Sequence, residues 1–193
     1  MRNSSKTNGS KAGNSKVSDS KTNESKAGNN MASKSKTNGS KAGMDPKDRK
    51  HINIACVGNP NCGKTTLFNA LTGSKLKVAN WPGVTVERFE GHTSYEDTDI
   101  TIVDTPGIYS LTCYTIEEKV TRQCVMDDDI DVIVNVVDAS SLERNLYLTL
   151  QLLELGKPIV LALNMMDIIK ERGMEIDMHR LPEMLGNIPV VPV

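Results

Sequence analysis

Between residues 51 and 193, short apolar runs alternate with longer segments in which apolar residues recur at helical spacing. The runs at 99–104 and 132–138 are β-branched and nearly continuous, which is typical of strands in a parallel sheet covered on both faces. The leucines of 142–155 form a helical stripe, which we expect to pack in the core. We predict strands at 51–58, 86–96, 99–105, 131–138, 158–164 and 188–193, and helices at 63–73, 115–127, 142–155 and 177–186.

This alternation predicts an α/β fold with a mostly parallel, six-stranded sheet and helices on both of its faces. The length of 193 residues is right for one such domain. Pro182 falls inside the last helical segment, where a proline lacks the backbone N–H and crowds the preceding turn. We therefore expect Pro182 to kink or restart that helix.

The N-terminal segment differs in composition from the rest of the chain. The sequence Ser5–Gly13 recurs with one substitution at 20–28 and again unchanged at 35–43. Ser, Lys, Asn, Thr and Gly dominate, so the segment cannot bury enough apolar area to offset its ordering entropy. We predict a disordered basic tail over 1–47 and a nucleotide-binding domain over 48–193. The tail is interpreted either as a tether to anionic lipid or RNA, or as a solvated extension without a partner.

Charge and cysteine content exclude several classes of protein. Residues 1–43 carry nine Lys or Arg against two Asp or Glu, and residues 44–193 carry fourteen against twenty-two. The acidic body argues against nucleic-acid binding through its own surface. No apolar stretch approaches the roughly 20 residues of a membrane helix, so we expect this chain alone to be soluble. Four cysteines without a C-x-x-C pair indicate reduced thiols rather than a zinc site: Cys56, Cys62, Cys113 and Cys124.

The strongest motif is a complete G-x-x-x-x-G-K-[ST] phosphate loop between the strand at 51–58 and the helix at 63–73. Backbone N–H groups and the helix dipole in such a turn favour bound phosphate. We expect Lys64 to reach the β- and γ-phosphates of a nucleotide and the Thr65 hydroxyl to bind Mg²⁺. The predicted nucleotide contacts of this loop are Gly58, Asn59, Pro60, Asn61, Cys62, Gly63, Lys64, Thr65 and Thr66.

A second motif follows the strand at 99–105 and reads Asp104, Thr105, Pro106, Gly107. An aspartate at the end of a strand beside the phosphate-loop strand can hold Mg²⁺. A glycine leaves its N–H free to meet a γ-phosphate, so Gly107 is a predicted catalytic residue.

The segment between these motifs contains Gly83, Val84 and Thr85 and is predicted to be a loop. Thr85 is the residue expected to close over Mg²⁺ and the γ-phosphate in the triphosphate state. The only tryptophan of the chain, Trp81, lies in this segment, and it either takes part in the switch or packs locally.

Asn164, Met165, Met166 and Asp167 form an N-x-x-D motif at the end of the strand at 158–164. The Asp167 carboxylate can accept hydrogen bonds from the N1–H and N2–H groups of guanine, which adenine does not offer. Asn164 is expected to tie this loop to the phosphate loop. Met165 supplies an apolar contact to the base without a charge, which predicts modest affinity and fast nucleotide exchange.

Taken together, 58–69, 80–87, 104–111, 135–149 and 164–167 closely resemble the ferrous iron transport protein B family. The resemblance covers about 48–193 and implies a P-loop GTPase fold that binds GTP or GDP with Mg²⁺. In that family a cytoplasmic GTPase domain precedes a regulatory domain and a membrane domain that takes up Fe²⁺. The resemblance therefore implies a membrane-embedded permease domain as partner, a place at the cytoplasmic face of the inner membrane, and a possible homo-oligomer.

The family also implies roles for single residues. Asn61 is expected to hold a K⁺ that stands in for an arginine finger, with the loop around Asn80 wrapping this ion. Ile108 occupies the place of a water-orienting glutamine, so slow hydrolysis is expected. The family continues beyond Val193 into a Ser-Ala guanine loop and a closing helix, and we expect that without them the domain is incomplete and leaves apolar sheet surface uncovered.

Two other functions remain open from the sequence. The chain could be a ribosome- or RNA-associated GTPase that uses its basic tail, which a steep salt dependence of RNA binding would support. It could also be a truncated remnant that binds nucleotide poorly.

Overall fold

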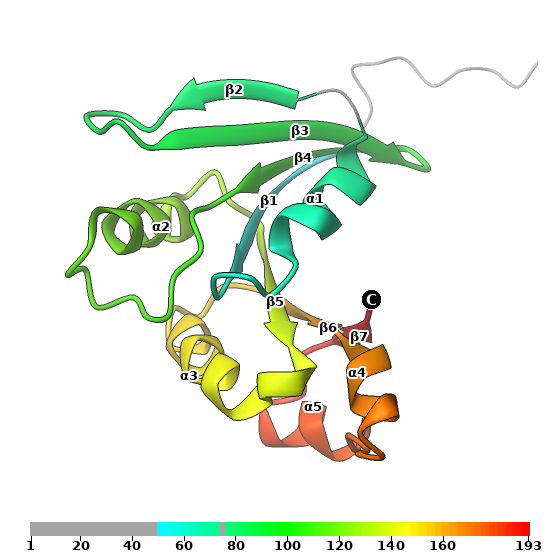
Figure 1. Cartoon of the computed structure of the whole chain (residues 1–193). Coiled ribbons are helices and arrows are strands. Elements are labelled where there is room, and N and C mark those ends of the chain that lie inside the picture. The colour runs from blue at the N-terminus through cyan, green and yellow to red at the C-terminus, as the bar shows by residue number, and fades with distance from the viewer. Residues whose placement is uncertain (1–49, 74–75) are drawn as a thin grey trace, which may run out of the picture. The chain divides into compact units, whose positions relative to one another are not determined.

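The computed structural model describes residues 50–73 and 76–193, so the predicted tail over 1–47 lies outside the described residues. Strands and helices alternate along the described part of the chain (Figure 1). The strands are β1 Lys50–Gly58, β2 Leu76–Asn80, β3 Glu87–Tyr95, β4 Thr98–Asp104, β5 Val132–Asp138, β6 Ile159–Asn164 and β7 Val190–Pro192. The α-helices are α1 Lys64–Thr72, α2 Ile116–Met126, α3 Leu142–Leu153, α4 Met166–Glu171 and α5 Arg180–Met184.

One mixed sheet runs through the domain in the order β2-β3-β4-β1-β5-β6-β7. The five strands from β4 to β7 pair in parallel, whereas β2 and β3 are antiparallel to their neighbours. The predicted α/β class and the mostly parallel sheet are thus confirmed. Because the parallel strands share a direction, the carboxyl ends of β1, β4, β5 and β6 meet at one edge of the sheet.

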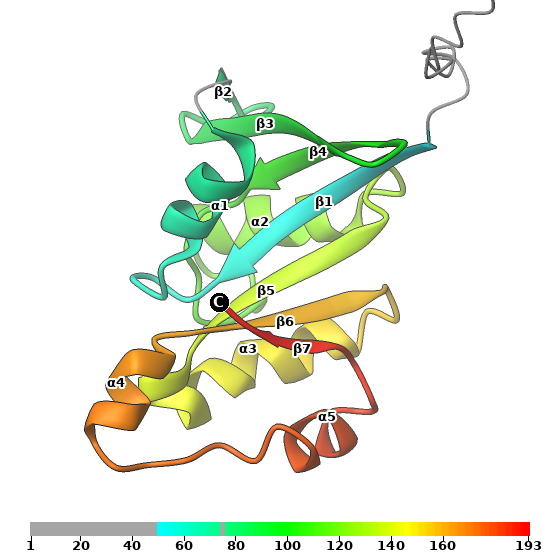
Figure 2. The same cartoon turned by 90° about the vertical axis from the view of Figure 1, so that its right-hand side faces the viewer.

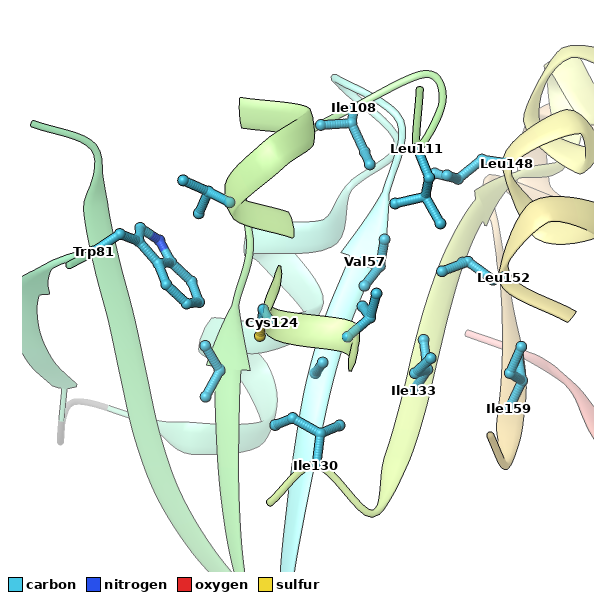
Figure 3. Close-up of a cluster of buried hydrophobic side chains, with 14 residues drawn as sticks. Val57, Trp81, Ile108, Leu111, Cys124, Ile130, Ile133, Leu148, Leu152 and Ile159 are labelled. Carbon is cyan, nitrogen blue, oxygen red and sulfur yellow. The ribbon is translucent and has the colours of Figure 1, made fainter. Parts of the chain in front are cut away.

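Helices cover both faces of this sheet (Figure 2). On one face, α2 and α3 pack over the centre of the sheet, and Leu148 and Leu152 of the predicted leucine stripe are fully buried there. Figure 3 shows both leucines pointing toward Ile133 of β5 and Val57 of β1. On the other face, Phe68 of α1 packs against alternate residues of the same strands.

The sheet has seven strands rather than the predicted six. The additional strand, β2, lies at the edge and pairs only with β3, with Asn80 opposite Glu87. All five of its residues are exposed, so its sequence lacks the apolar alternation that identifies a half-buried strand. The predicted loop between the phosphate-loop helix and β3 is correspondingly shorter, at 81–86.

The C-terminal helices also differ from the prediction. The helix α4 was predicted as loop, and α5 covers five residues rather than 177–186. Pro182 is the third residue of α5, where its N–H is not needed for a helical bond, so the proline starts a short helix instead of kinking a long one. In the described part of the chain, no helix has the length and hydropathy needed to cross a membrane.

Candidate functional site: a nucleotide pocket at the carboxyl edge of the sheet

The phosphate loop leaves β1 at Gly58 and enters α1 at Lys64. Asn61 and Gly63 adopt positive φ angles of 64° and 88°, and Cys62 N donates to Asn59 O at 3.3 Å. This curled loop forms the wall of a pocket at the sheet edge. The residues that line the pocket are Asn59, Pro60, Asn61, Gly63, Lys64, Thr65, Thr66, Gly107 and Met165.

A buried charged pair joins the first two motifs. Lys64 is 8% exposed, and its Nζ donates to Asp104 Oδ1 at the end of β4. Thr65 Oγ1 donates to the other carboxylate oxygen, Oδ2, at 3.1 Å. The side chains that the sequence assigned to phosphate and Mg²⁺ therefore meet, and each charge is neutralised by its partner in this arrangement.

The D-T-P-G loop is bonded directly to β1 and to the phosphate loop. Thr105 donates to Cys56 O through both its backbone N (3.1 Å) and its Oγ1 (2.9 Å). Ile108 N donates to Gly58 O at 3.1 Å. Gly107 lies so close to the phosphate loop that a Cβ built on it would be 3.1 Å from Pro60 Cα. The loop that would sense a γ-phosphate is thus in contact with the loop that would hold the other phosphates.

The N-x-x-D loop reaches the same pocket from β6. Asn164 Nδ2 donates to Cys62 O at 2.9 Å, and Asn164 Oδ1 accepts from Met165 N at 2.8 Å. The predicted tie between the two loops is therefore present. Met165 has a positive φ of 62° and lines the pocket, whereas Met166 packs against the apolar cluster between α4 and α5. Asp167 is exposed in the first turn of α4.

The segment predicted to switch lies apart from the pocket. The side chain of Thr85 is exposed, and Gly83 has a positive φ of 76° in an open turn. Figure 1 shows this β2–β3 turn beside α2 and away from the phosphate loop. Trp81 is 6% exposed and packs in the main core, as Figure 3 shows beside Cys124. Of the two interpretations of Trp81, local packing describes this structure.

A second opening lies next to Asp104. Three of the residues that line it were not assigned to the site from the sequence. They are Val86, Glu87 and Phe89, which share this opening with Lys64 and Thr65. Their place follows from the register of β3 on β4, in which Phe89 is opposite Asp104. A strand prediction without a register could not find them.

Two buried cysteines belong to this region, Cys56 on β1 and Cys62 in the phosphate loop. Burial raises the pKa of the Cys56 thiol from 9.0 to about 12, and the nearby Asp104 charge adds to this rise. Burial likewise raises the pKa of the Cys62 thiol. Both groups are neutral thiols at physiological pH, so they pack as small apolar side chains.

Three features define the G domain of a P-loop GTPase: a glycine-rich loop between a strand and a helix, a strand-end aspartate paired with the lysine of that loop, and an N-x-x-D loop bonded to the glycine-rich loop. Comparison with known proteins identifies the family within this class of GTPases. The chain belongs to the family of ferrous iron transport protein B, whose model matches residues 52–193.

Relatives and solved structures agree with this assignment. The Fe(2+) transporter FeoB of Escherichia coli K12 is 52% identical over 148 residues, which are 75% of this chain and 19% of the relative. A GDP-bound mutant of S. thermophilus NFeoB matches with a TM-score of 0.70 and 49% identity, covering 74% of this chain and 55% of that one. The G domain of the T. maritima FeoB iron transporter matches with a TM-score of 0.69 and 44% identity, covering 74% and 87%. The chain thus spans about a fifth of the length of the curated relatives it matches.

Proposed function

We propose that this chain is a GTP-binding, slowly GTP-hydrolysing switch domain of a ferrous iron uptake protein. The observation that carries the proposal is the meeting of Lys64, Thr65 and Asp104 beside a loop held in place by Asn164. The phosphate loop and Met165 of the N-x-x-D loop line one pocket, and Asp167, the proposed guanine-selective residue, follows in the first turn of α4. The GDP bound by the S. thermophilus relative supports the choice of nucleotide.

The donors at this edge fit a magnesium ion. Mg²⁺ prefers oxygen ligands, and the Thr65 hydroxyl and the Asp104 carboxylate lie 3.1 Å apart in the second opening, next to the phosphate loop. When bound, the ion supplies positive charge to the β- and γ-phosphates. When nucleotide and metal are present, the Lys64 ammonium would leave Asp104 and pair with the phosphates. The Asp104 carboxylate would then face the positive charge of the metal instead. For Thr85 to reach this ion, the β2–β3 turn that carries it would have to move toward the phosphate loop.

The Asn61 side chain fits the role of a potassium ligand. Asn61 is exposed on the phosphate loop and lines the pocket, where its amide oxygen is available to a monovalent cation. Such a charge would assist the transfer of the phosphoryl group to water.

Hydrolysis is expected to be slow because Ile108 cannot orient water. Its side chain is 3% exposed and points into the core in Figure 3. The Gly107 N–H remains as the group of this loop that would contact the γ-phosphate.

The remaining functions belong to the whole protein. The relatives named Fe(2+) transporter are about five times as long as the matched segment. We propose that nucleotide state in this domain is coupled to Fe²⁺ transport by a membrane-embedded permease domain, at the cytoplasmic face of the inner membrane. We also propose that the whole protein forms a homo-oligomer.

The direct test is a titration of the chain with fluorescent GDP and GTP in KCl and then NaCl, with ATP as competitor. We expect guanine-selective binding that ATP does not displace, and hydrolysis that is faster in K⁺. The variant Asn61→Ala should bind GDP as the parent does and lose the difference between K⁺ and Na⁺. A folded chain that binds no guanine nucleotide would overturn the proposal.

A further inference from the structure

Asn59, in the phosphate loop, carries a buried amide without any partner. The residue is 2% exposed, and neither its Nδ2 nor its Oδ1 has a hydrogen bond. An asparagine amide can donate two bonds and accept two, and buried amides in folded proteins are nearly always paired. Among the described residues, four buried side-chain atoms lack a partner, and two of them belong to Asn59. The other two belong to Trp81 and Arg88, on the hairpin proposed to switch.

Two other buried asparagines show that this fold can satisfy such groups. Asn145 is 3% exposed, and its amide donates to Ser141 O at 2.9 Å and accepts from Asp138 N at 3.3 Å. Asn135 is 1% exposed and donates to Thr149 Oγ1 at 2.7 Å. The unpaired amide of Asn59 therefore does not reflect a general defect of the core.

The surroundings of Asn59 connect two functional loops. The residue before it, Gly58, accepts the hydrogen bond from Ile108 N, and the residue after it, Pro60, is in contact with Gly107. Asn59 also lines the nucleotide pocket. A change in the D-T-P-G loop is thus transmitted to the backbone on either side of Asn59.

We propose that Asn59 is a positioning residue whose amide becomes hydrogen-bonded only when the D-T-P-G loop closes on a guanosine triphosphate. The inference rests on the proposed function of the pocket. In the nucleotide-free chain the unpaired amide disfavours this arrangement of the two loops, and in the triphosphate state its new bonds hold the Gly107 loop in place. The residue would therefore couple occupancy of the pocket to the position of that loop without touching the reacting atoms.

The test compares thermal unfolding of the full chain, free and with a non-hydrolysable GTP analogue, Mg²⁺ and K⁺, for the parent, Asn59→Ala and Asn145→Ala. We expect Asn59→Ala to leave the melting temperature of the free chain unchanged or raise it by about 2–4 °C, since an unpaired buried amide is removed. The same variant should bind the analogue about tenfold more weakly, which corresponds to the loss of one hydrogen bond, and it should lose more affinity for the analogue than for GDP. Asn145→Ala, which removes a paired amide, should lower both melting temperatures by the same amount.

A second variant separates positioning from packing. Asn59→Ser keeps a hydroxyl and should recover part of the analogue affinity, and single-turnover GTP hydrolysis should fall in Asn59→Ala and partly recover in Asn59→Ser. A free chain that Asn59→Ala destabilises as much as Asn145→Ala does would overturn the proposal, as would unchanged affinity for the analogue. If the parent itself binds no guanine nucleotide, the proposed function fails with it, whereas parent binding without an effect at Asn59 overturns only this inference.

Discussion

Trp81 anchors the start of the 81–86 loop in the core, and we infer that moving Thr85 to the magnesium site requires that contact to open. The indole is 6% exposed in the core, and the Arg88 guanidinium lies over its ring at 5.0 Å. Trp81 N also donates to Val86 O at 2.9 Å, which closes the turn. We therefore predict that weakening the Trp81 contact favours the triphosphate state.

The size of the effect follows from what the substitution Trp81→Leu removes. Leucine buries about 60 Å² less than tryptophan, which at about 25 cal/mol per Å² costs roughly 1.5 kcal/mol. Loss of the cation–π contact with Arg88 adds about 0.5–1 kcal/mol. This cost falls on the state in which the ring is buried. If the ring leaves its site in the triphosphate state, the difference of about 2 kcal/mol becomes a gain of roughly 30-fold in affinity for a GTP analogue.

The assay is a titration of Trp81→Leu with fluorescent GDP and a fluorescent GTP analogue in Mg²⁺ and K⁺. We expect tighter binding of the analogue and no change for GDP. In the parent chain, Trp81 is the only tryptophan, so its emission reports this site alone. The emission should shift to longer wavelength and become open to acrylamide quenching when the analogue binds.

A matched control is Val120→Ala, which thins the same core cluster from α2 and leaves the residues of the hairpin unchanged. This variant should lower stability and leave the ratio of analogue to GDP affinity unchanged. The reasoning is refuted if Trp81→Leu binds the analogue no more tightly than the parent does. An emission maximum that stays fixed on analogue binding would refute it independently.

Four further predictions concern other parts of the structure. Gly63→Ala should abolish nucleotide binding, because its Cβ would lie 2.1 Å from the Asn164 amide at a φ of 88°. Gly73→Ala has open space around it but a φ of 64° and a ψ of −146°, so it should cost about 1–3 kcal/mol in chemical denaturation and keep binding. Asp167→Asn should lose preference for GDP and gain affinity for xanthosine diphosphate in competition titrations, since an amide N–H can face the xanthine carbonyl; retained guanine preference would show that Asp167 does not contact the base. Burial raises the pKa of Cys56 from 9.0 to about 12. The stability that the neutral Cys56 thiol contributes is therefore complete below pH 9.0 and is lost as the pH rises toward 12. Cys56→Ala should flatten this decline when urea midpoints are measured between pH 9 and 12. For the same reason, a thiol reagent at neutral pH should label the partly exposed Cys113 well before the three buried cysteines, and equal rates would contradict the buried packing.

Sequence reasoning located most of the sheet and the three nucleotide loops. The buried runs at 99–104 and 132–138 became β4 and β5, because a strand covered on both faces needs apolar side chains throughout. It failed at β2, whose five exposed residues are ordered only by pairing with β3. It also missed α4, a six-residue helix that follows the end of β6 and is held by the burial of Ile169.

The sequence by itself determined the chemistry of the site. Motif spacing places Asp104 and Asn164 at strand ends and Lys64 at the start of the helix that follows the phosphate loop, and parallel strands bring such ends to one edge of the sheet. Only the tertiary structure decided which groups are paired and which are left without a partner. The bond between Asn164 and Cys62 joins residues 102 positions apart, whereas the amide of Asn59 has none. Hydrogen-bond satisfaction and burial depend on neighbours that the chain brings together from distant segments, and local sequence carries little information about them.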